Sequence, residues 1–333
     1  MKKTFVAVWV CFVWFALSNR AEAEVTFLQR CYTCYQGETA AISFFHDGKT
    51  PNERFYLLNE RGEQLAEAVT FGIESCQTVY LNVTEEMQSM KLFVQREKTE
   101  APDDAMLLAI DRRPGATISR VEREDNKIAL TFDTANGIGY LPQILDILNE
   151  YNVKATFFLQ GTFLRNYPDK TQMIEAYGHE VGNHSYNHPN MLELDAGEIL
   201  SDFEKSADIF EKVLGHQPVL YRPPSGASTL RDRAIARTLG QEVIHWTVDS
   251  RDGFHSATLK EVLNRVRENM GPGSIILMHV YGKYTVQALR TLLPEYLEQG
   301  YSFVTVSELL LQGDTYVDSQ GVQRLRETDE TVN

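Results

Sequence analysis

Two histidines, His184 and His188, stand four residues apart and are the first candidates for metal chemistry in this 333-residue chain. On a helical turn this spacing puts both imidazoles on one face, where they can bind the same ion. Glycines at 178 and 182 frame a short apolar step, which predicts that the pair follows the end of a strand. By itself the spacing is more typical of surface or helix-capping histidines, so its meaning depends on the other polar residues.

Further chemically active side chains stand where predicted strands end. In a parallel barrel all such ends lie on one face, and that face hosts the active site. One such residue could simply be a strand end that faces water, but packing does not explain the same feature at five strands. These strands end, in chain order, in Asp133, His184, Arg222, Asp249 with Asp252 just beyond, and His279.

The residue types in this set complement one another. Two histidines can hold a divalent metal, and a nearby carboxylate can act as a base toward a water on that metal. An arginine can keep the carboxylate ionised, while a further histidine, oriented by an aspartate, can protonate a leaving group. The set therefore predicts metal-assisted hydrolysis of an amide or an ester.

An α/β alternation predicts the elements that position these residues. From residue 127 onward, apolar strands alternate with amphipathic helices, which indicates a parallel sheet with right-handed crossovers. An alternation of this length can close into a distorted (β/α) barrel of about seven strands. The predicted strands are 127–133, 155–159, 179–184, 219–222, 242–249, 274–279 and 302–306, and the predicted helices are 141–150, 170–177, 196–214, 230–239, 259–270, 286–299 and 307–312.

The chain before the barrel has a different pattern. Residues 24–111 contain short β-prone runs separated by turn signals, which predicts a small β-sandwich domain without a catalytic constellation. Residues 112–126 are charged and contain Pro and Gly, as is typical of a linker. The barrel is expected over 127–312, and 313–333 is expected to be a polar tail that frays.

The first 23 residues have the pattern of a secretory signal peptide. Two lysines precede a short apolar run over 5–17, and Ala21-Glu22-Ala23 matches a small-x-small cleavage site. The run is below the roughly 20 residues that a spanning helix needs, so we expect cleavage rather than anchoring. The mature chain is then secreted, in the cell wall or periplasm, without a stable membrane span.

The composition of the chain limits the classes of partner that it can bind. With 43% hydrophobic and 23% charged residues the chain is typical of a globular protein, and its net charge of -14 gives no electrostatic reason to bind nucleic acid or an anionic membrane. Signal cleavage leaves Cys31, Cys34 and Cys76 in an oxidising compartment, where a disulfide is the default. We expect Cys76 to pair with either of the other two.

The spaced motifs over about 127–311 resemble the polysaccharide deacetylase family, also called the NodB-homology domain or carbohydrate esterase family four. Short phrases around Gly182, Pro223 and Thr305 are most similar to the branch found in spore-forming bacteria. The motifs that carry the resemblance are Thr131-Phe132-Asp133, Lys154-Ala155-Thr156-Phe157-Phe158, 178–188, Arg222-Pro223-Pro224-Ser225-Gly226, 246–252 and Leu277-Met278-His279.

The resemblance implies a barrel that removes acetyl groups from N-acetylated sugars of peptidoglycan or a chitin-like polysaccharide, with a divalent metal, most often zinc. It assigns roles position by position. Asp133 would be the base, His184 and His188 the metal ligands, Arg222 the residue that orients Asp133, Asp252 the support of His279, and His279 the general acid, while Leu277, Pro223 and Trp246 would contact the substrate.

Two departures from the family pattern bear on activity. The family usually has a second aspartate after the base as a third metal ligand, and here Thr134 occupies that position. A hydroxyl is a poor replacement for a carboxylate at a hard cation, so Thr134 itself, Asn136 or water would have to fill the place. An aromatic residue is usual at Gly253, but Phe254 comes one position later.

These departures leave alternatives open. One is a catalytically weak or inactive barrel that binds glycan, and another is an O-acetyl polysaccharide esterase that shares the mechanism. The retention of Asp133, Arg222, Asp252 and His279 favours the deacetylase, because an inactive protein has no chemical need for them.

Overall fold

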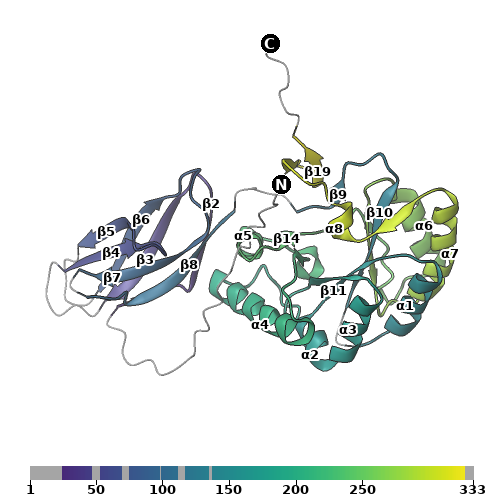
Figure 1. Cartoon of the computed structure of the whole chain (residues 1–333), viewed down its shortest axis with the longest axis horizontal. Helices are drawn as coiled ribbons and strands as arrows, with labels where there is room; N and C mark the ends of the chain where they lie inside the picture. Colours follow the sequence, from purple (N-terminus) through teal and green to yellow (C-terminus); the bar gives the residue numbers. More distant parts are fainter. Residues whose placement is uncertain are drawn as a thin grey trace, which may run out of the picture.

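The computed structural model describes residues 25–46, 53–69, 75–97, 99–111, 117–134 and 137–326 (Figure 1). The predicted signal peptide over 1–23 and the candidate ligand Asn136 lie outside these described residues. Within them, no helix combines the length and the apolar character needed to cross a membrane.

The first part of the chain forms two packed sheets, as predicted. The core between them is built from alternating inward side chains such as Ile42, Phe44, Phe55 and Leu57, all at most 2% exposed. One sheet has the order β1 (Val25–Phe27), β3 (Thr39–His46), β6 (Ser75–Asn82), and the other has the order β2 (Cys31–Tyr35), β8 (Asp104–Asp111), β7 (Met90–Arg96), β4 (Arg54–Leu58), β5 (Gln64–Val69).

The second part is built on a parallel sheet, which confirms the predicted distorted barrel. Central strands such as Lys127–Asp133 are buried on both faces and therefore almost continuously apolar. The order is β14 (Glu242–Val243), β13 (Leu220–Tyr221), β12 (Glu180–Asn183), β11 (Thr156–Leu159), β10 (Lys127–Asp133), β16 (Ile275–His279), β15 (Val248–Asp249), with β17 (Ser302–Val304) also paired to β10.

The predicted strand over 242–249 is divided in two, so the sheet has eight strands instead of about seven. Its halves, β14 and β15, lie at opposite ends of the sheet, and residues 244–247 connect them. Backbone bonds from this connection reach other partners, because the His245 N–H donates to the Ile118 carbonyl and the Thr247 N–H donates to the Ile275 carbonyl. The chain itself thus links the two edges of the open barrel.

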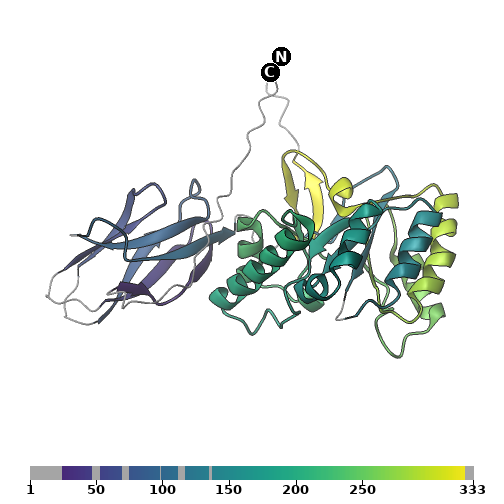
Figure 2. The same cartoon turned by 60° about the horizontal axis from the view of Figure 1, so that its bottom comes forward.

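Helices cover the outer side of this sheet (Figures 1 and 2). Their boundaries follow local signals: α4 begins with a capping box between Asp195 and Glu198 and ends at Gly215, whose φ is 77°. The helices are α1 (Leu141–Glu150), α2 (Gly161–Asn166), α3 (Pro168–Ala176), α4 (Ala196–Leu214), α5 (Leu230–Thr238), α6 (Leu259–Asn269), α7 (Thr285–Glu298) and α8 (Val306–Leu309), with a short 3-10 turn η1 (Pro224–Gly226).

The regions expected to be a linker and a polar tail contain further strands. β9 (Arg120–Val121) pairs with β19 (Val322–Leu325), which also pairs with β18 (Thr315–Val317). These C-terminal strands are yellow in Figure 2, where they lie beside the barrel. Residues 313–326 therefore belong to the folded body, because they find hydrogen-bond partners about 200 positions earlier in the chain.

The expected disulfide is wrong: Cys31, Cys34 and Cys76 are all free. Cys31 and Cys34 are three residues apart on β2 and therefore face opposite sides of its sheet. Cys31 joins a cluster with residues of α4 and α5, whereas Cys34 lies in the sandwich core. Cys76 is exposed on β6, which belongs to the other sheet, so neither Cys31 nor Cys34 faces it.

Candidate active site

The candidate base and the candidate acid occupy paired positions on neighbouring strands. In the parallel register of β10 and β16, Asp133 stands opposite His279 and Thr131 stands opposite Leu277. Paired residues point to the same face of a sheet, and neighbouring strands are about 4.8 Å apart. The strand register therefore places the side chains of Asp133, His279 and Leu277 on one face, at the carboxyl ends of both strands.

A completely buried arginine holds Asp133. The Arg222 guanidinium donates to Asp133 Oδ1 at 2.8 Å and to Thr131 Oγ1 at 2.9 Å. It also donates to the His245 carbonyl at 3.0 Å, and its Cζ lies 4.0 Å from the ring centre of Phe158. Arg222 is thus fixed by contacts on several sides and presents one edge to the carboxylate.

The electrostatic surroundings keep Asp133 ionised. Burial alone would raise the pKa of this carboxyl, but the opposing effect of Arg222, together with His184 and His279, lowers the pKa below its usual 3.8. Asp133 is 5% exposed. An ionised carboxylate held in this way can accept a proton from a water molecule.

A buried aspartate orients His279. Asp252 Oδ1 accepts from Nδ1 of His279 at 2.8 Å, and Oδ2 accepts from the backbone N–H of His279 at 2.9 Å. The hydroxyls of Ser250 and Thr285 also donate to this carboxylate. Burial opposes protonation of His279, but the hydrogen bond and charge of Asp252 outweigh it and raise the pKa of the imidazole above 6.5. With Nδ1 bound to Asp252, Nε2 is the atom left to donate a proton.

The loop after β15 approaches His279 more closely than a side chain would allow. A Cβ built on Gly253 would lie 2.9 Å from Nδ1 of His279, so glycine is required for this contact. Exposed aromatic rings follow both Gly253 and His279 in the chain. Phe254 is 57% exposed, and Tyr281 is 42% exposed with its ring centre 5.0 Å from that of His279.

The two histidines of the opening motif meet beside Asp133. His184 Nδ1 lies 2.8 Å from the Arg222 carbonyl, which only accepts, so this nitrogen carries the proton. His184 Nε2 lies 3.4 Å from Asp133 Oδ2, and the ring centre of His188 lies 5.0 Å from that of His184. Ser185 and His188 have φ of 64° and 60°, so the backbone of this loop is strained, as is common at functional sites.

These histidines fit a divalent cation. Burial lowers the pKa of His184 to about 4, so Nε2 holds a lone pair directed at a carboxylate oxygen. Two electron-rich atoms at 3.4 Å are unfavourable unless a positive charge lies nearby. Donation of the other ring N–H to a carbonyl is also the usual support of a metal-ligating histidine.

The third ligand position does not fit as well. Thr134 is 2% exposed; its hydroxyl accepts from the Gln160 N–H at 3.1 Å and lies 3.5 Å from the Phe158 carbonyl. The hydroxyl is therefore already bound to the backbone. In the part of the chain that the structure describes, no three His, Cys, Asp or Glu side chains form a metal-binding group.

Two of the remaining predicted substrate residues are buried. Leu277 is 4% exposed on β16, and Pro223 is buried directly after Arg222. Trp246 stacks on His245 at 3.8 Å between ring centres, and its ring lies 5.7 Å from the Arg222 Cζ. A Cβ on Gly226 would come within 2.7 Å of Trp246, so that glycine admits the ring pair.

Sequence reasoning gave no role to several supporting residues. Thr131, Ser250, Thr285 and Tyr281 all contact predicted site residues, but they are ordinary residue types without a distinctive spacing. Thr131 was detectable in principle, since it lies two positions before Asp133 on the same strand face.

Comparison with known proteins supports the fold and the family. Residues 120–244 match the family model described as polysaccharide deacetylase. A Bacillus cereus peptidoglycan-N-acetylglucosamine deacetylase is 35% identical over 211 residues, which cover 62% of this chain and 98% of that protein. An uncharacterised Bacillus subtilis protein, YlxY, is 36% identical, and the match covers 55% of this chain and only 57% of that protein's length.

A solved structure with the same fold is described as a pseudoenzyme instead of a deacetylase. The wild-type Bacillus anthracis protein described as a carbohydrate esterase family four pseudoenzyme is 36% identical, with a TM-score of 0.56 over 59% of this chain and 69% of that one. Together with the near-complete match to the Bacillus cereus protein, this likeness shows that the chain belongs to the polysaccharide deacetylase family, a family of hydrolases that act on carbon–nitrogen bonds.

Proposed function

We propose that this protein is an exported, metal-dependent hydrolase that removes acetyl groups from N-acetylated sugars of a cell-wall or chitin-like polysaccharide. The observation that carries the proposal is the pair of supported groups, Asp133 with Arg222 and His279 with Asp252, at matching positions of β10 and β16. Several relatives are described as peptidoglycan deacetylases, which favours peptidoglycan as the polysaccharide. The signal-like segment over 1–23 is the basis for export, followed by the β domain over 24–111 and the barrel over 127–312.

The protein groups divide the reaction between them. Asp133 takes a proton from the water whose oxygen attacks the acetyl carbon, and Arg222 holds the carboxylate in place throughout. His279 gives a proton from Nε2 to the sugar nitrogen as the carbon–nitrogen bond breaks, which yields acetate and a free amine. Leu277 lies on the same strand face as His279 and provides an apolar wall for the acetyl methyl group.

His184 and His188 would hold the divalent cation, for which zinc suits two imidazole ligands. When bound, the cation supplies Lewis acidity toward the acetyl carbonyl and the attacking water. Because the Thr134 hydroxyl is bound to backbone groups, Asn136 or water would fill the third ligand position.

A second candidate function is glycan binding with little or no hydrolysis. It is favoured by Thr134 in place of a carboxylate and by the likeness to a pseudoenzyme. An O-acetyl esterase would use the same residues on an ester, so substrate tests must include both acetyl linkages.

Acetate release is the decisive measurement. Purified mature protein is supplied with zinc and incubated with peptidoglycan, chitin oligomers and an O-acetylated xylan, and free acetate is quantified. The proposal expects acetate from an N-acetylated substrate and a loss of about 100-fold or more in the His279→Ala variant. Bound polysaccharide without acetate release would instead establish the second candidate.

A further inference from the structure

The β domain lies at the α4 and α5 end of the barrel (Figure 1), and side chains of both parts are buried where they meet. Asp111 at the end of β8 is completely buried; Arg237 of α5 donates to its Oδ1 at 2.6 Å, and Arg233 Nε lies 3.7 Å from Oδ2. Cys31 and Ala109 share an apolar cluster with Ile199 and other side chains of α4 and α5. The sandwich is therefore a fixed wall of the molecule rather than a tethered module.

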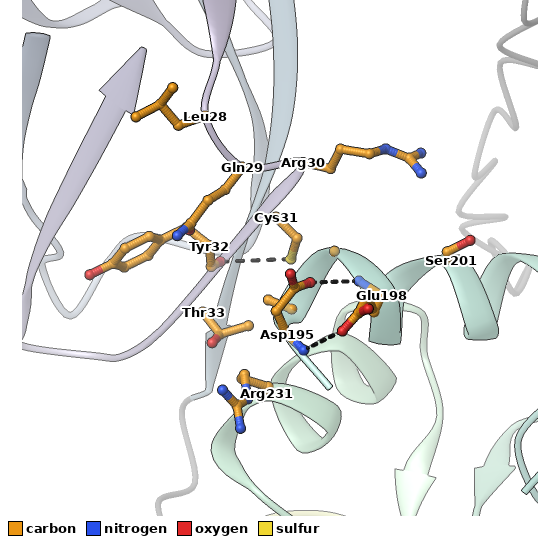
Figure 3. A pocket seen from close by; sticks show the side chains of 12 residues that line it. Leu28, Gln29, Arg30, Cys31, Tyr32, Thr33, Asp195, Glu198, Ser201 and Arg231 are labelled. Atoms are coloured by element: carbon orange, nitrogen blue, oxygen red, sulfur yellow. Dashed lines mark hydrogen bonds between the residues drawn. The ribbon is translucent and has the colours of Figure 1, made fainter. Parts of the chain in front are cut away.

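A cavity of about 600 Å³ lies along this interface (Figure 3). One wall is the segment over 28–33 of the β domain, and the other is made by the first turns of α4 and α5. Its volume is within the usual range for small-molecule sites.

The cavity lies on the same face of the barrel as the candidate active site. The first turns of helices in a parallel α/β barrel stand beside the carboxyl ends of its strands. The loop before α4 carries His184 and His188, and the loop before α5 follows Arg222. Arg231 connects the cavity lining to the loop that carries the two histidines. Its Nη2 lies 3.5 Å from the carbonyl of Leu192, four residues after His188.

The lining combines apolar surface with charged groups of both signs. Arg30 and Arg231 oppose Asp195 and Glu198, whose carboxylates are bound to each other's backbone N–H in the capping box. Arg231 Nε is buried and has no hydrogen-bond partner among the residues that the structure describes. Arg30 is paired with Glu204, so Arg231 is the cation of the lining left for a ligand. Apolar surface together with charges that balance suits a neutral, hydroxyl-bearing ring such as a sugar better than an anion.

We propose that this cavity binds sugar units of the same polysaccharide, away from the acetyl group that is hydrolysed, so that the β domain helps to position the polymer. This inference rests on the proposed function. It explains why an otherwise non-catalytic sandwich is fixed against the helices that follow the site loops. It predicts that long substrates gain affinity that short ones lack.

Two variants from the α4 and α5 side test the cavity. Arg231→Ala removes the guanidinium from the lining, and Ser201→Leu places a larger apolar group there. Arg290→Ala is the matched control, because Arg290 of α7 forms an exposed ion pair with Glu150 of α1, and these helices lie at the end of the barrel away from the β domain (Figure 1). None of these residues belongs to the proposed catalytic set.

The assay compares acetate release from polymeric peptidoglycan with release from tri-N-acetylchitotriose. We expect both cavity variants to raise KM for the polymer about tenfold, as for loss of one charged hydrogen bond, with kcat and trimer activity unchanged. An unchanged polymer KM, or an equal loss on both substrates, would overturn the inference.

Sedimentation with insoluble peptidoglycan keeps the inference separate from the proposed hydrolysis. If the wild-type protein releases no acetate, the proposed hydrolase fails, but the cavity variants should still bind polymer about tenfold more weakly than the Arg290→Ala control. Equal binding by all variants would refute the cavity proposal alone.

Discussion

Replacing Asp252 with asparagine should lower the pKa of His279 by about one pH unit. In the native protein the negative charge and hydrogen bond of Asp252 raise this pKa against the effect of burial. Asparagine keeps a polar atom near Nδ1 but removes the charge. A hydrogen bond to a charged group contributes about 1 to 2 kcal/mol more than a neutral one, and 1.36 kcal/mol corresponds to one pKa unit. Loss of the negative neighbour favours the neutral imidazole, so the pKa must fall.

Proton NMR titration of the imidazole measures this pKa without any substrate, with the His279 signal assigned by its absence in His279→Gln. Where acetate release is measurable, the alkaline limb of the pH–rate profile should move to lower pH by the same amount, because the protonated acid is required. Ser250→Ala is the matched control, since it removes one hydrogen bond to Asp252 and leaves the charge. An unchanged titration in Asp252→Asn, or an equal change in Ser250→Ala, would refute this account of the acid.

Three further outcomes are expected. Purified protein should bind about one equivalent of zinc, measured by elemental analysis, and His184→Ala should lose it; no binding even with excess zinc would remove the metal from the proposal. Asp111→Asn should lower the free energy of unfolding, measured by urea titration, by about 3–5 kcal/mol, because two buried guanidiniums lose their anion. In the same titration, Glu295→Gln at the exposed pair with Arg267 should lower it by less than about 1 kcal/mol. Burial lowers the pKa of His179 to about 4, so as pH falls the imidazole is protonated in the unfolded chain before it is protonated in the folded one. The free energy of unfolding should therefore decrease from pH 6.5 toward pH 4 by at most about 3 kcal/mol. In urea titrations at stepped pH, His179→Gln should weaken this pH dependence.

Much of the fold could be predicted because the relevant signals are local. Strands such as β10 and β16 are short apolar runs that end in Asp133 and His279, and the pattern of alternating helices fixes their parallel direction. The facing of Asp133 and His279 follows from that arrangement, which is why the candidate site could be assembled from the sequence.

The parts that could not be predicted depend on distant partners. Residues 242–249 look like one apolar strand, but their halves pair with strands at opposite ends of the sheet. The C-terminal strands exist because β9 offers a free edge. The predicted disulfide was wrong for the same reason, because spacing along the chain does not indicate which sheet or which face of a sheet carries a thiol.

The reactivity of the three free cysteines described above can report local opening of the structure. Cys76 is exposed on β6 and should react with a thiol reagent at once. Cys31 is 1% exposed at the cavity between the β domain and the barrel, so its labelling requires local movement at that interface. Cys34 is 2% exposed within the sandwich and becomes accessible only when that core unfolds. Labelling rates in one sample would therefore rank undocking against unfolding.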